Sequence, residues 1–224
     1  MGHGFTLRTK VALAGRLLRN RAALAAASAE VDLLLPEVLF RTHCVARASV
    51  PLMAAALARA DALGSADRVA HGMCEYLRRH IEEEREHGAW VLEDLGALGV
   101  AADAVLARTP PPTIAQLVGA QYYWIEHAHP VALLSYIAVL EEYVTPADVM
   151  RELAARSRLP RPAFRTLLEH SDVDPSHVAE LYALIDALPL SSAQAELLGV
   201  NAFRTIELLN RSFDELGGAP AVGG

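Results

Sequence analysis

The chain has 224 residues, 53% of them hydrophobic, which is enough apolar material for one domain with a substantial core. Its 27 acidic and 20 basic residues give a formal net charge of −7, so the composition offers no electrostatic attraction for nucleic acid. With only two cysteines, the chain is not expected to have a disulfide framework. No apolar stretch is long enough to span a membrane, so a membrane partner is not expected. We expect a cytoplasmic protein.

Helices are predicted along the whole chain, because apolar residues recur at steps of three and four and β-branched residues are sparse. The expected helices cover about residues 6–27, 37–63, 67–98 and 114–143, a short stretch after 146, a helix ending near 170, a segment interrupted at Pro175, and 191–216. The fold class is therefore all-α. Residues 1–216 are expected to form one helical bundle domain and residues 217–224 a flexible tail.

The expected helix over 67–98 carries a carboxylate on its apolar face. The stripe that repeats at steps of three and four consists of Leu77, Ile81, Glu84, Gly88, Val91 and Leu95. A carboxylate inside such a stripe is costly unless it is paired, protonated or bound to metal. His87 lies three residues after Glu84, so both side chains can converge on one point, and together they form a two-ligand unit.

Two further segments repeat this pattern of polar ligands on an apolar face. In the expected helix over 114–143, Glu141 shares a face with Leu134 and Ile137. Later in the chain, His170, Asp174 and His177 stand at positions i, i+4 and i+7, which lie within a narrow arc of a helix. Three carboxylates and three histidines suit a dinuclear carboxylate site in a bundle, whereas structural zinc sites use about four ligands rich in Cys or His.

Several assignments stay open at the level of single residues. Glu83 is a rival of Glu84, and Glu142 is a rival of Glu141. Asp174 precedes a proline, so it also suits the N-cap of a helix. His80 precedes Glu84 by four residues, which makes it a seventh ligand, a group that supports the ligands, or a partly buried structural histidine.

Three segments resemble the haem-oxygenase-like diiron oxidases, which are described as iron-containing redox enzymes. HIEEEREHGAWVLEDLGALG resembles the Glu-x-x-His helix of that family, SYIAVLEEY resembles its middle glutamate helix, and HSDVDPSHVAEL resembles its His-x3-Asp-x2-His helix. The resemblance implies a single-domain, haem-oxygenase-like seven-helix bundle that binds two iron ions and no haem. The metal ligands that it implies are Glu84, His87, Glu141, His170, Asp174 and His177.

The same resemblance implies an O2-dependent non-haem diiron oxidoreductase that needs O2 as co-substrate and an external reductant as electron donor. Its expected substrate is a small amine or amino-acid-like molecule, and its expected reaction is N-oxygenation in natural-product biosynthesis. Oxidative C–C bond cleavage of an amino acid or fatty acid is the alternative on the same ligands. A metal-free enzyme similar to thiaminase II or pyrroloquinoline quinone synthase is a competing hypothesis, and a non-catalytic helical binding protein is a third. A homodimer is the general expectation for such a bundle.

Overall fold

Helices make up all of the regular secondary structure in the described part of the chain. The computed structural model describes residues 2–28, 30–143 and 145–216, without the side chains of 23–27 and 172–176. The helices are α1 (His3–Ala14), α2 (Arg16–Ala27), α3 (Val31–Leu63), α4 (Arg68–Glu84), α5 (His87–Ala97), α6 (Ala102–Ala107), α7 (Pro112–His127), α8 (Ala132–Glu142), α9 (Ala147–Arg156), the 3-10 helix η1 (Arg161–Phe164), α10 (Arg165–Ala187) and α11 (Ser192–Leu216). The predicted all-α class is confirmed. The expected tail, 217–224, lies outside the described residues.

Three of the expected helices are each divided in two, which is one reason why the described residues form more than seven helices. The helix expected over 6–27 breaks at Gly15, where an added Cβ would lie 1.7 Å from the hydroxyl oxygen of Tyr143. That hydroxyl donates to the backbone carbonyl of Val11 at 2.5 Å. The helix expected over 67–98 breaks between α4 and α5, and the one over 114–143 breaks between α7 and α8, around Pro130.

Proline interrupts the helices less than predicted. Pro36 and Pro51 lie inside α3, and Pro175 lies inside the 23-residue helix α10. The predictions that the second helix starts after Pro36 and that Pro175 breaks the chain were therefore wrong. An interior proline costs about 3 kcal/mol of helix stability. Both helices pack along their length against several others, α3 against α4, α5 and α7, and α10 against α1 and α8, and this burial outweighs the local cost.

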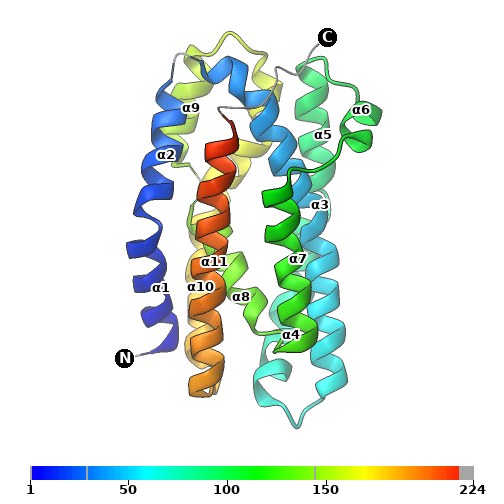
Figure 1. Ribbon diagram of the computed structural model, residues 1–224, viewed down its shortest axis with the longest axis vertical. Helices are drawn as coiled ribbons and strands as arrows, with labels where there is room; N and C mark the ends of the chain where they lie inside the picture. The colour runs from blue at the N-terminus through cyan, green and yellow to red at the C-terminus, as the bar shows by residue number, and fades with distance from the viewer. Residues whose placement is uncertain (1, 29, 144, 217–224) are drawn as a thin grey trace.

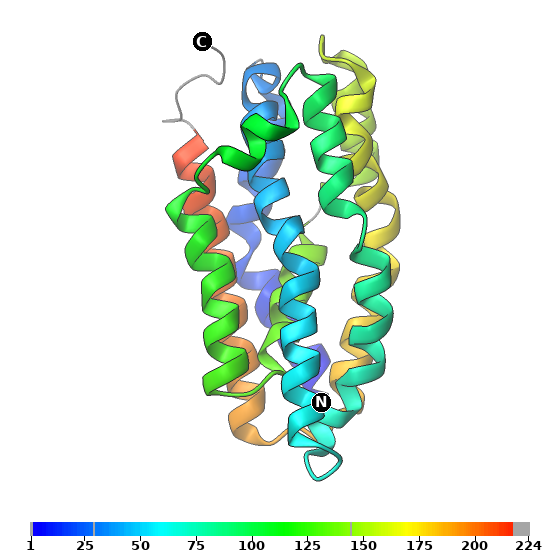
Figure 2. The same ribbon diagram turned by 90° about the vertical axis from the view of Figure 1, so that its right-hand side faces the viewer.

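The helices run roughly along the long axis of the molecule, with α8 inside the bundle (Figures 1 and 2). This short helix packs against α7, α10 and α11, and every residue from Ala132 to Val139 is buried. A helix that is apolar on all sides belongs inside a core. α8 ends at Glu141 and Glu142, so two partly buried carboxylates lie at the C-terminal end of this helix.

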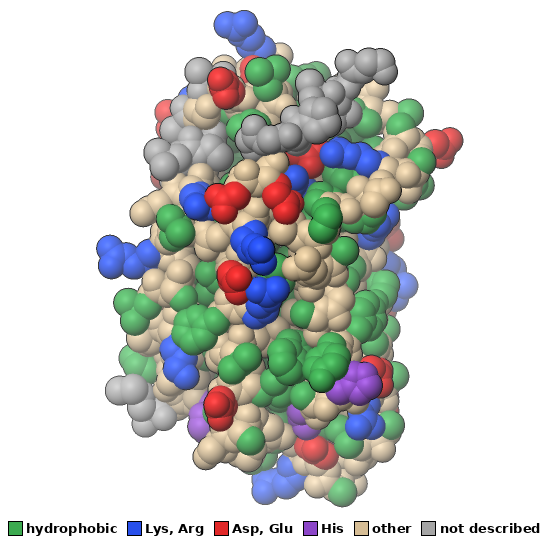
Figure 3. All heavy atoms as spheres, viewed as in Figure 1, with side chains coloured by type: hydrophobic (Ala, Val, Ile, Leu, Met, Phe, Trp, Pro, Cys, Tyr) green, Lys and Arg blue, Asp and Glu red, His purple; other side chains and the backbone are tan. Residues whose placement is uncertain are grey.

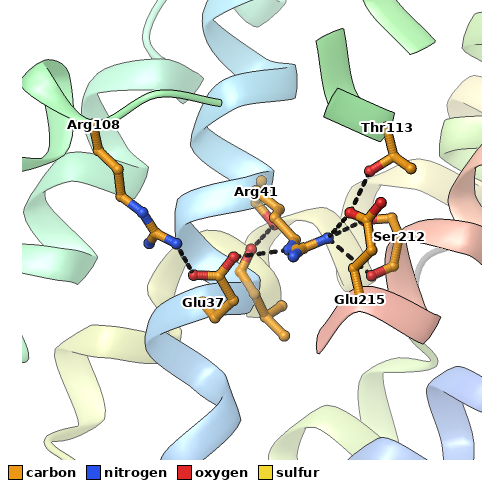
Figure 4. A network of polar contacts seen from close by, with 8 residues as sticks. Glu37, Arg41, Arg108, Thr113, Ser212 and Glu215 are labelled. Atoms are coloured by element: carbon orange, nitrogen blue, oxygen red, sulfur yellow. Dashed lines mark hydrogen bonds and ion pairs between the residues drawn. The ribbon is translucent and has the colours of Figure 1, made fainter. Parts of the chain in front are cut away.

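A polar network joins α3, the start of α7 and α11 (Figure 4). The guanidinium of Arg41 donates from Nε to Glu37 at 2.9 Å and from Nη1 to the carbonyl and hydroxyl of Ser212, both at 2.9 Å. Arg108 donates to the other oxygen of Glu37 at 2.5 Å, and Thr113 donates to Glu215 at 2.6 Å. The network ties segments far apart in the sequence at one end of the bundle.

The surface in Figure 3 has acidic and basic side chains interspersed, with hydrophobic side chains gathered in the lower half of that face. Among the described residues drawn there, no continuous basic stripe of the kind that binds nucleic acid is visible. No helix in the described ranges combines the length and apolar character that crossing a membrane requires.

Candidate metal centre

One group of potential metal ligands joins α4, α5 and α10. Glu84 is the last residue of α4, His87 is the first of α5, and His170 lies on α10. Oε2 of Glu84 lies 3.0 Å from Nδ1 of His87, and the rings of His87 and His170 have centroids 4.5 Å apart. The ligand atoms of all three lie within 4.8 Å of one another, which is close enough for one ion to contact them together.

A second group lies beside the first, on the preceding turn of α4 and the following turns of α10. Nδ1 of His80 lies 3.1 Å from Oε2 of Glu83, and Nε2 of His177 lies 3.9 Å from the same oxygen. These three ligand atoms also lie within 4.8 Å of one another. The Glu83 side chain is 37% exposed and that of Glu84 only 16%, so the second group is the more open to solvent.

Glu141 extends the second group from the buried helix α8. Its Oε1 lies 3.1 Å from Nε2 of His80 and 3.9 Å from Nδ1 of His177. Its Oε2 is buried and has no hydrogen-bond partner among the described residues. A buried carboxylate oxygen without a donor loses its hydration with no compensation. A bound cation would supply that compensation, so the residues present fit a metal ion.

The protonation states favour metal binding in the first group. Burial raises the pKa of Glu84, but the close approach of His87 and the charges of nearby histidines outweigh it, so the pKa falls below its usual value and the carboxylate stays ionised. Burial lowers the pKa of His170, which keeps its imidazole neutral. Nδ1 of His170 lies 2.7 Å from the carbonyl of Thr166, and a proton donated there leaves Nε2 as the free ligand atom.

A buried carboxylate supports this histidine from α5. Oδ2 of Asp94 accepts a hydrogen bond from the backbone N–H of Thr166 at 2.9 Å, at the start of α10. The carbonyl of the same residue, Thr166, then orients His170. Asp94 thus fixes the turn that orients the candidate ligand His170. Asp94 was not among the residues predicted from the sequence, and its contact with the start of α10 has no local signal in the sequence.

The structure places five of the six predicted ligands in two neighbouring groups. It brings Glu84, His87 and His170 together, and it brings Glu141 and His177 together beside His80. The side chain of Asp174 lies outside the described residues. Its backbone lies inside α10, ten positions into a helix that begins at Arg165, so the prediction that Asp174 could cap the start of a helix was wrong.

The open choices between neighbouring glutamates have different outcomes. Glu83 and Glu84 both face histidines, but in different groups, so neither replaces the other. Glu142 points toward a different partner, because its Oε2 lies 4.0 Å from Nε of Arg8 on α1. His80 is buried among Glu83, Glu141 and the ring of Tyr76, on which it stacks at 5.2 Å. The sequence signal for His80 was the His-x3-Glu-x2-His pattern that ends at His87, which has the same spacing as the His-x3-Asp-x2-His motif of α10.

A cavity of about 270 Å³ opens onto both groups. Its walls come mainly from α3, α8 and α10, and Glu84, Glu141, His80 and His170 form part of its lining. Most of the other lining residues are apolar, including Leu52, Met53, Leu133, Ile137 and Leu140. This volume is close to the lower limit of the roughly 300–1,000 Å³ of small-molecule pockets, so a small organic molecule fits beside the candidate ligands.

Residues 37–210 match the model of a family described as iron-containing redox enzymes. No curated protein sequence matches the chain. Among solved structures, a domain of unknown function with a haem oxygenase-like fold from Shewanella denitrificans is similar with a TM-score of 0.78 and 18% identity, over 96% of this chain and 91% of that one. A TenA homologue from Pseudomonas syringae pv. tomato has a TM-score of 0.74 and 10% identity, over 96% and 92% of the two chains.

A CADD-like protein of unknown function from Nostoc punctiforme is similar with a TM-score of 0.66 and 16% identity, over 96% of this chain and 93% of that one. These identities are low, so the likeness concerns the fold alone. The haem-oxygenase-like fold that the sequence motifs implied is confirmed.

Proposed function

The chain belongs to the family of iron-containing redox enzymes, and on that premise we propose that it is an O2-dependent oxidoreductase with two iron ions between α4, α5, α8 and α10. The observation that carries this proposal is the pair of ligand groups beside one cavity, together with a buried oxygen of Glu141 that has no hydrogen-bond partner among the described residues. Mixed imidazole and carboxylate donors suit iron better than a structural zinc site, which is rich in Cys and His.

The proposed ligands divide between two metal positions. Glu84, His87 and His170 would hold one iron. Glu141 and His177 would hold the other, and Asp174 is added on the basis of its place in the His-x3-Asp-x2-His motif. Carboxylates at the centre of such a site can reach both ions. When bound, iron supplies the one-electron chemistry that O2 activation requires.

The chain's own residues orient the ligands and exclude water. Asp94 and the carbonyl of Thr166 hold His170 with its Nε2 free, and Glu141 lies at the end of α8, which is buried from Ala132 to Val139. The apolar cavity walls limit water beside the ligands, which strengthens the electrostatic interactions there. We propose N-oxygenation of a small amine, in natural-product biosynthesis, with electrons from an external reductant. Oxidative C–C cleavage would use the same ligands.

A thiaminase-like function, which needs a nucleophilic thiol facing the pocket, has less support. Burial raises the pKa of Cys44 and of Cys74, which disfavours the reactive thiolate. Neither sulfur lines the cavity, and Cys74 donates instead to the carbonyl of Ala70 at 3.3 Å. Both cysteines are therefore interpreted as structural, and the iron-dependent function is preferred.

Anaerobic titration with Fe(II) tests the proposal. We expect saturation near two iron ions per chain, because the site offers two groups of ligands around carboxylates. Rapid mixing of this sample with O2 should then produce a transient visible absorption band. Failure to bind near two iron ions per chain, or a loaded protein whose spectrum does not respond to O2, would reject the diiron assignment.

Replacing Asp174 by alanine should lower the iron content to about one ion per chain without unfolding the protein, because the second position would lose an anionic ligand. Metal analysis and the circular dichroism of the helices are the measurements. Asp172→Ala, two residues earlier on α10 and outside the i, i+4, i+7 series, is the matched control. Unchanged iron content in Asp174→Ala would remove this residue from the ligand set.

A further inference from the structure

His80 is a buried histidine with a carboxylate oxygen close to each of its ring nitrogens. It lies on α4, one turn before Glu84, and it lines the cavity together with Glu84, Glu141 and His170. Its Nδ1 lies 3.1 Å from Oε2 of Glu83, and its Nε2 lies 3.1 Å from Oε1 of Glu141. The two contacts have the same length, but they differ in geometry.

Only the contact with Glu83 has the geometry of a hydrogen bond. An ionised carboxylate can only accept, so this contact assigns a proton to Nδ1 of His80. Oε1 of Glu141 has no hydrogen-bond partner among the described residues, although Nε2 of His80 is only 3.1 Å away. The two atoms are therefore close without pointing at each other. Two ligands of one metal ion have this relation, because both point at the ion, and donors about 2.1 Å from it at right angles are about 3.0 Å apart.

Glu84 and His87, which the proposed function assigns to one iron, show the same relation. Oε2 of Glu84 lies 3.0 Å from Nδ1 of His87, and that nitrogen is buried without a hydrogen-bond partner among the described residues. By contrast, Nε2 of His129 and Oδ2 of Asp67, which do not line the cavity, are 3.1 Å apart and hydrogen-bonded. The missing hydrogen bond therefore distinguishes the pairs at the candidate metal centre from an ordinary histidine–carboxylate pair.

His177 has a similar position relative to the same oxygen of Glu141. Its Nδ1 lies 3.9 Å from Oε1 of Glu141, within the range of about 3.0–4.2 Å that two donors on one ion can span. The rings of His80 and His177 lie edge to face, with centroids 5.6 Å apart. One oxygen from α8 and two imidazole nitrogens, from α4 and α10, thus have the spacing of ligands around one ion.

We propose, resting on the function proposed above, that His80 is a seventh metal ligand, which binds the iron of Glu141 and His177 through Nε2. Glu83 is a positioning residue, because it accepts the Nδ1 proton and so fixes the ring with Nε2 toward the ion. Histidine ligands commonly donate their other ring N–H to a carboxylate in this way. The His-x3-Glu-x2-His pattern that ends at His87 then supplies a ligand at each of its three named positions.

A protonated His80 that only neutralises the surrounding carboxylates is the competing explanation. Burial lowers the pKa of His80, but Glu141, with smaller contributions from Glu84 and Glu83, raises it by more, so a positive charge is favoured here. A bound metal ion meets the same requirement. The two explanations differ in what the loss of the imidazole does to iron binding.

Anaerobic Fe(II) titration of His80→Gln separates the two. The dissociation constant of the second ion should rise at least about tenfold, because the ion loses a nitrogen ligand, while that of the first ion stays the same. If His80 only neutralised carboxylates, removal of its charge would leave the second ion bound equally or more tightly, and that result would overturn the proposal. His129→Gln is the matched control, because this histidine has the same 3.1 Å contact with a carboxylate away from the cavity, and it should bind both ions normally.

Two substitutions of Glu83 test its positioning role by the same titration. Glu83→Ala removes the acceptor of the His80 proton and should weaken binding of the second ion about tenfold. Glu83→Gln keeps an acceptor oxygen without the charge, so it should restore most of the affinity. Equal losses in Glu83→Ala and Glu83→Gln would show that the charge of Glu83 is required, and would overturn its role as an orienting acceptor.

A crystal structure of the Fe(II)-loaded original protein, with iron located by its anomalous scattering, tests the ligand without any substitution. Nε2 of His80 should lie about 2.1 Å from one iron ion, and Nδ1 should still contact Glu83. Two bound ions that are both more than about 3 Å from this nitrogen would overturn the seventh ligand and leave the diiron assignment intact. Fewer than two ions would overturn both, so the two failures are distinguishable.

Discussion

Replacing Glu141 by glutamine is expected to lower the iron content from about two ions per chain to one or fewer, and to abolish turnover that depends on O2. Glutamine has nearly the same size and shape, so the change removes the negative charge and leaves the packing of α8. Oε1 of Glu141 lies within 3.9 Å of both His80 and His177, and Oε2 has no donor among the described residues. A neutral amide cannot supply the anionic ligand that this position provides.

The adjacent glutamate offers a matched control for this change. Glu142 is also half-buried at the end of α8, and burial raises its pKa, but its nearest cation is Arg8 at 4.0 Å rather than a histidine of the centre. Glu142→Gln should keep both iron ions. Metal analysis and circular dichroism of the two variants give the comparison. If Glu142→Gln loses iron while Glu141→Gln keeps it, the assignment of the two carboxylates is reversed.

The positions of Glu84 and Glu141 could be predicted because both interrupt an apolar stripe, and the cost of burying a charge makes such a residue informative. The same reasoning failed for Glu83, which lies off the stripe of α4. Side chains of adjacent helical residues diverge by about 100°, so a single helix would turn only one of the two glutamates inward. Here Nε2 of His177 on α10 lies 3.9 Å from Oε2 of Glu83 on α4, and only the tertiary fold brings these two residues together.

Other features of the site depend on contacts that a sequence pattern does not contain. Asp94 and Thr166 lie 72 residues apart, and nothing local to either indicates that the carboxylate meets the start of α10. Pro175 has a strong local preference that favours a break, yet tertiary packing keeps α10 continuous. Local propensity therefore predicted the helices and the inward faces, whereas long-range packing decided the helix breaks and the supporting residues.

Replacing Arg41 by alanine should reduce the free energy of unfolding by about 3–5 kcal/mol, because it breaks a buried ion pair and leaves the partner carboxylate in place. The Arg41 and Glu37 side chains are only 9% and 6% exposed. Without the guanidinium, Glu37 keeps Arg108 as its one cationic partner, and the carbonyl of Ser212 loses its donor. The network would then no longer join α3 to α11 (Figure 4).

Urea denaturation followed by circular dichroism measures this loss, and a fall in Tm of about 6 °C or more should accompany it. Arg78→Ala is the matched control. Its partner Asp61 lies 3.2 Å away, but both side chains are more than half exposed, and solvent screening limits such a pair to about 0–1 kcal/mol. Arg41→Lys should fall between the two, because lysine keeps the charge but cannot reproduce the fork that contacts Glu37 and Ser212 together. A loss in Arg41→Ala no larger than that in Arg78→Ala would show that the network orders the ends of these helices without stabilising the fold.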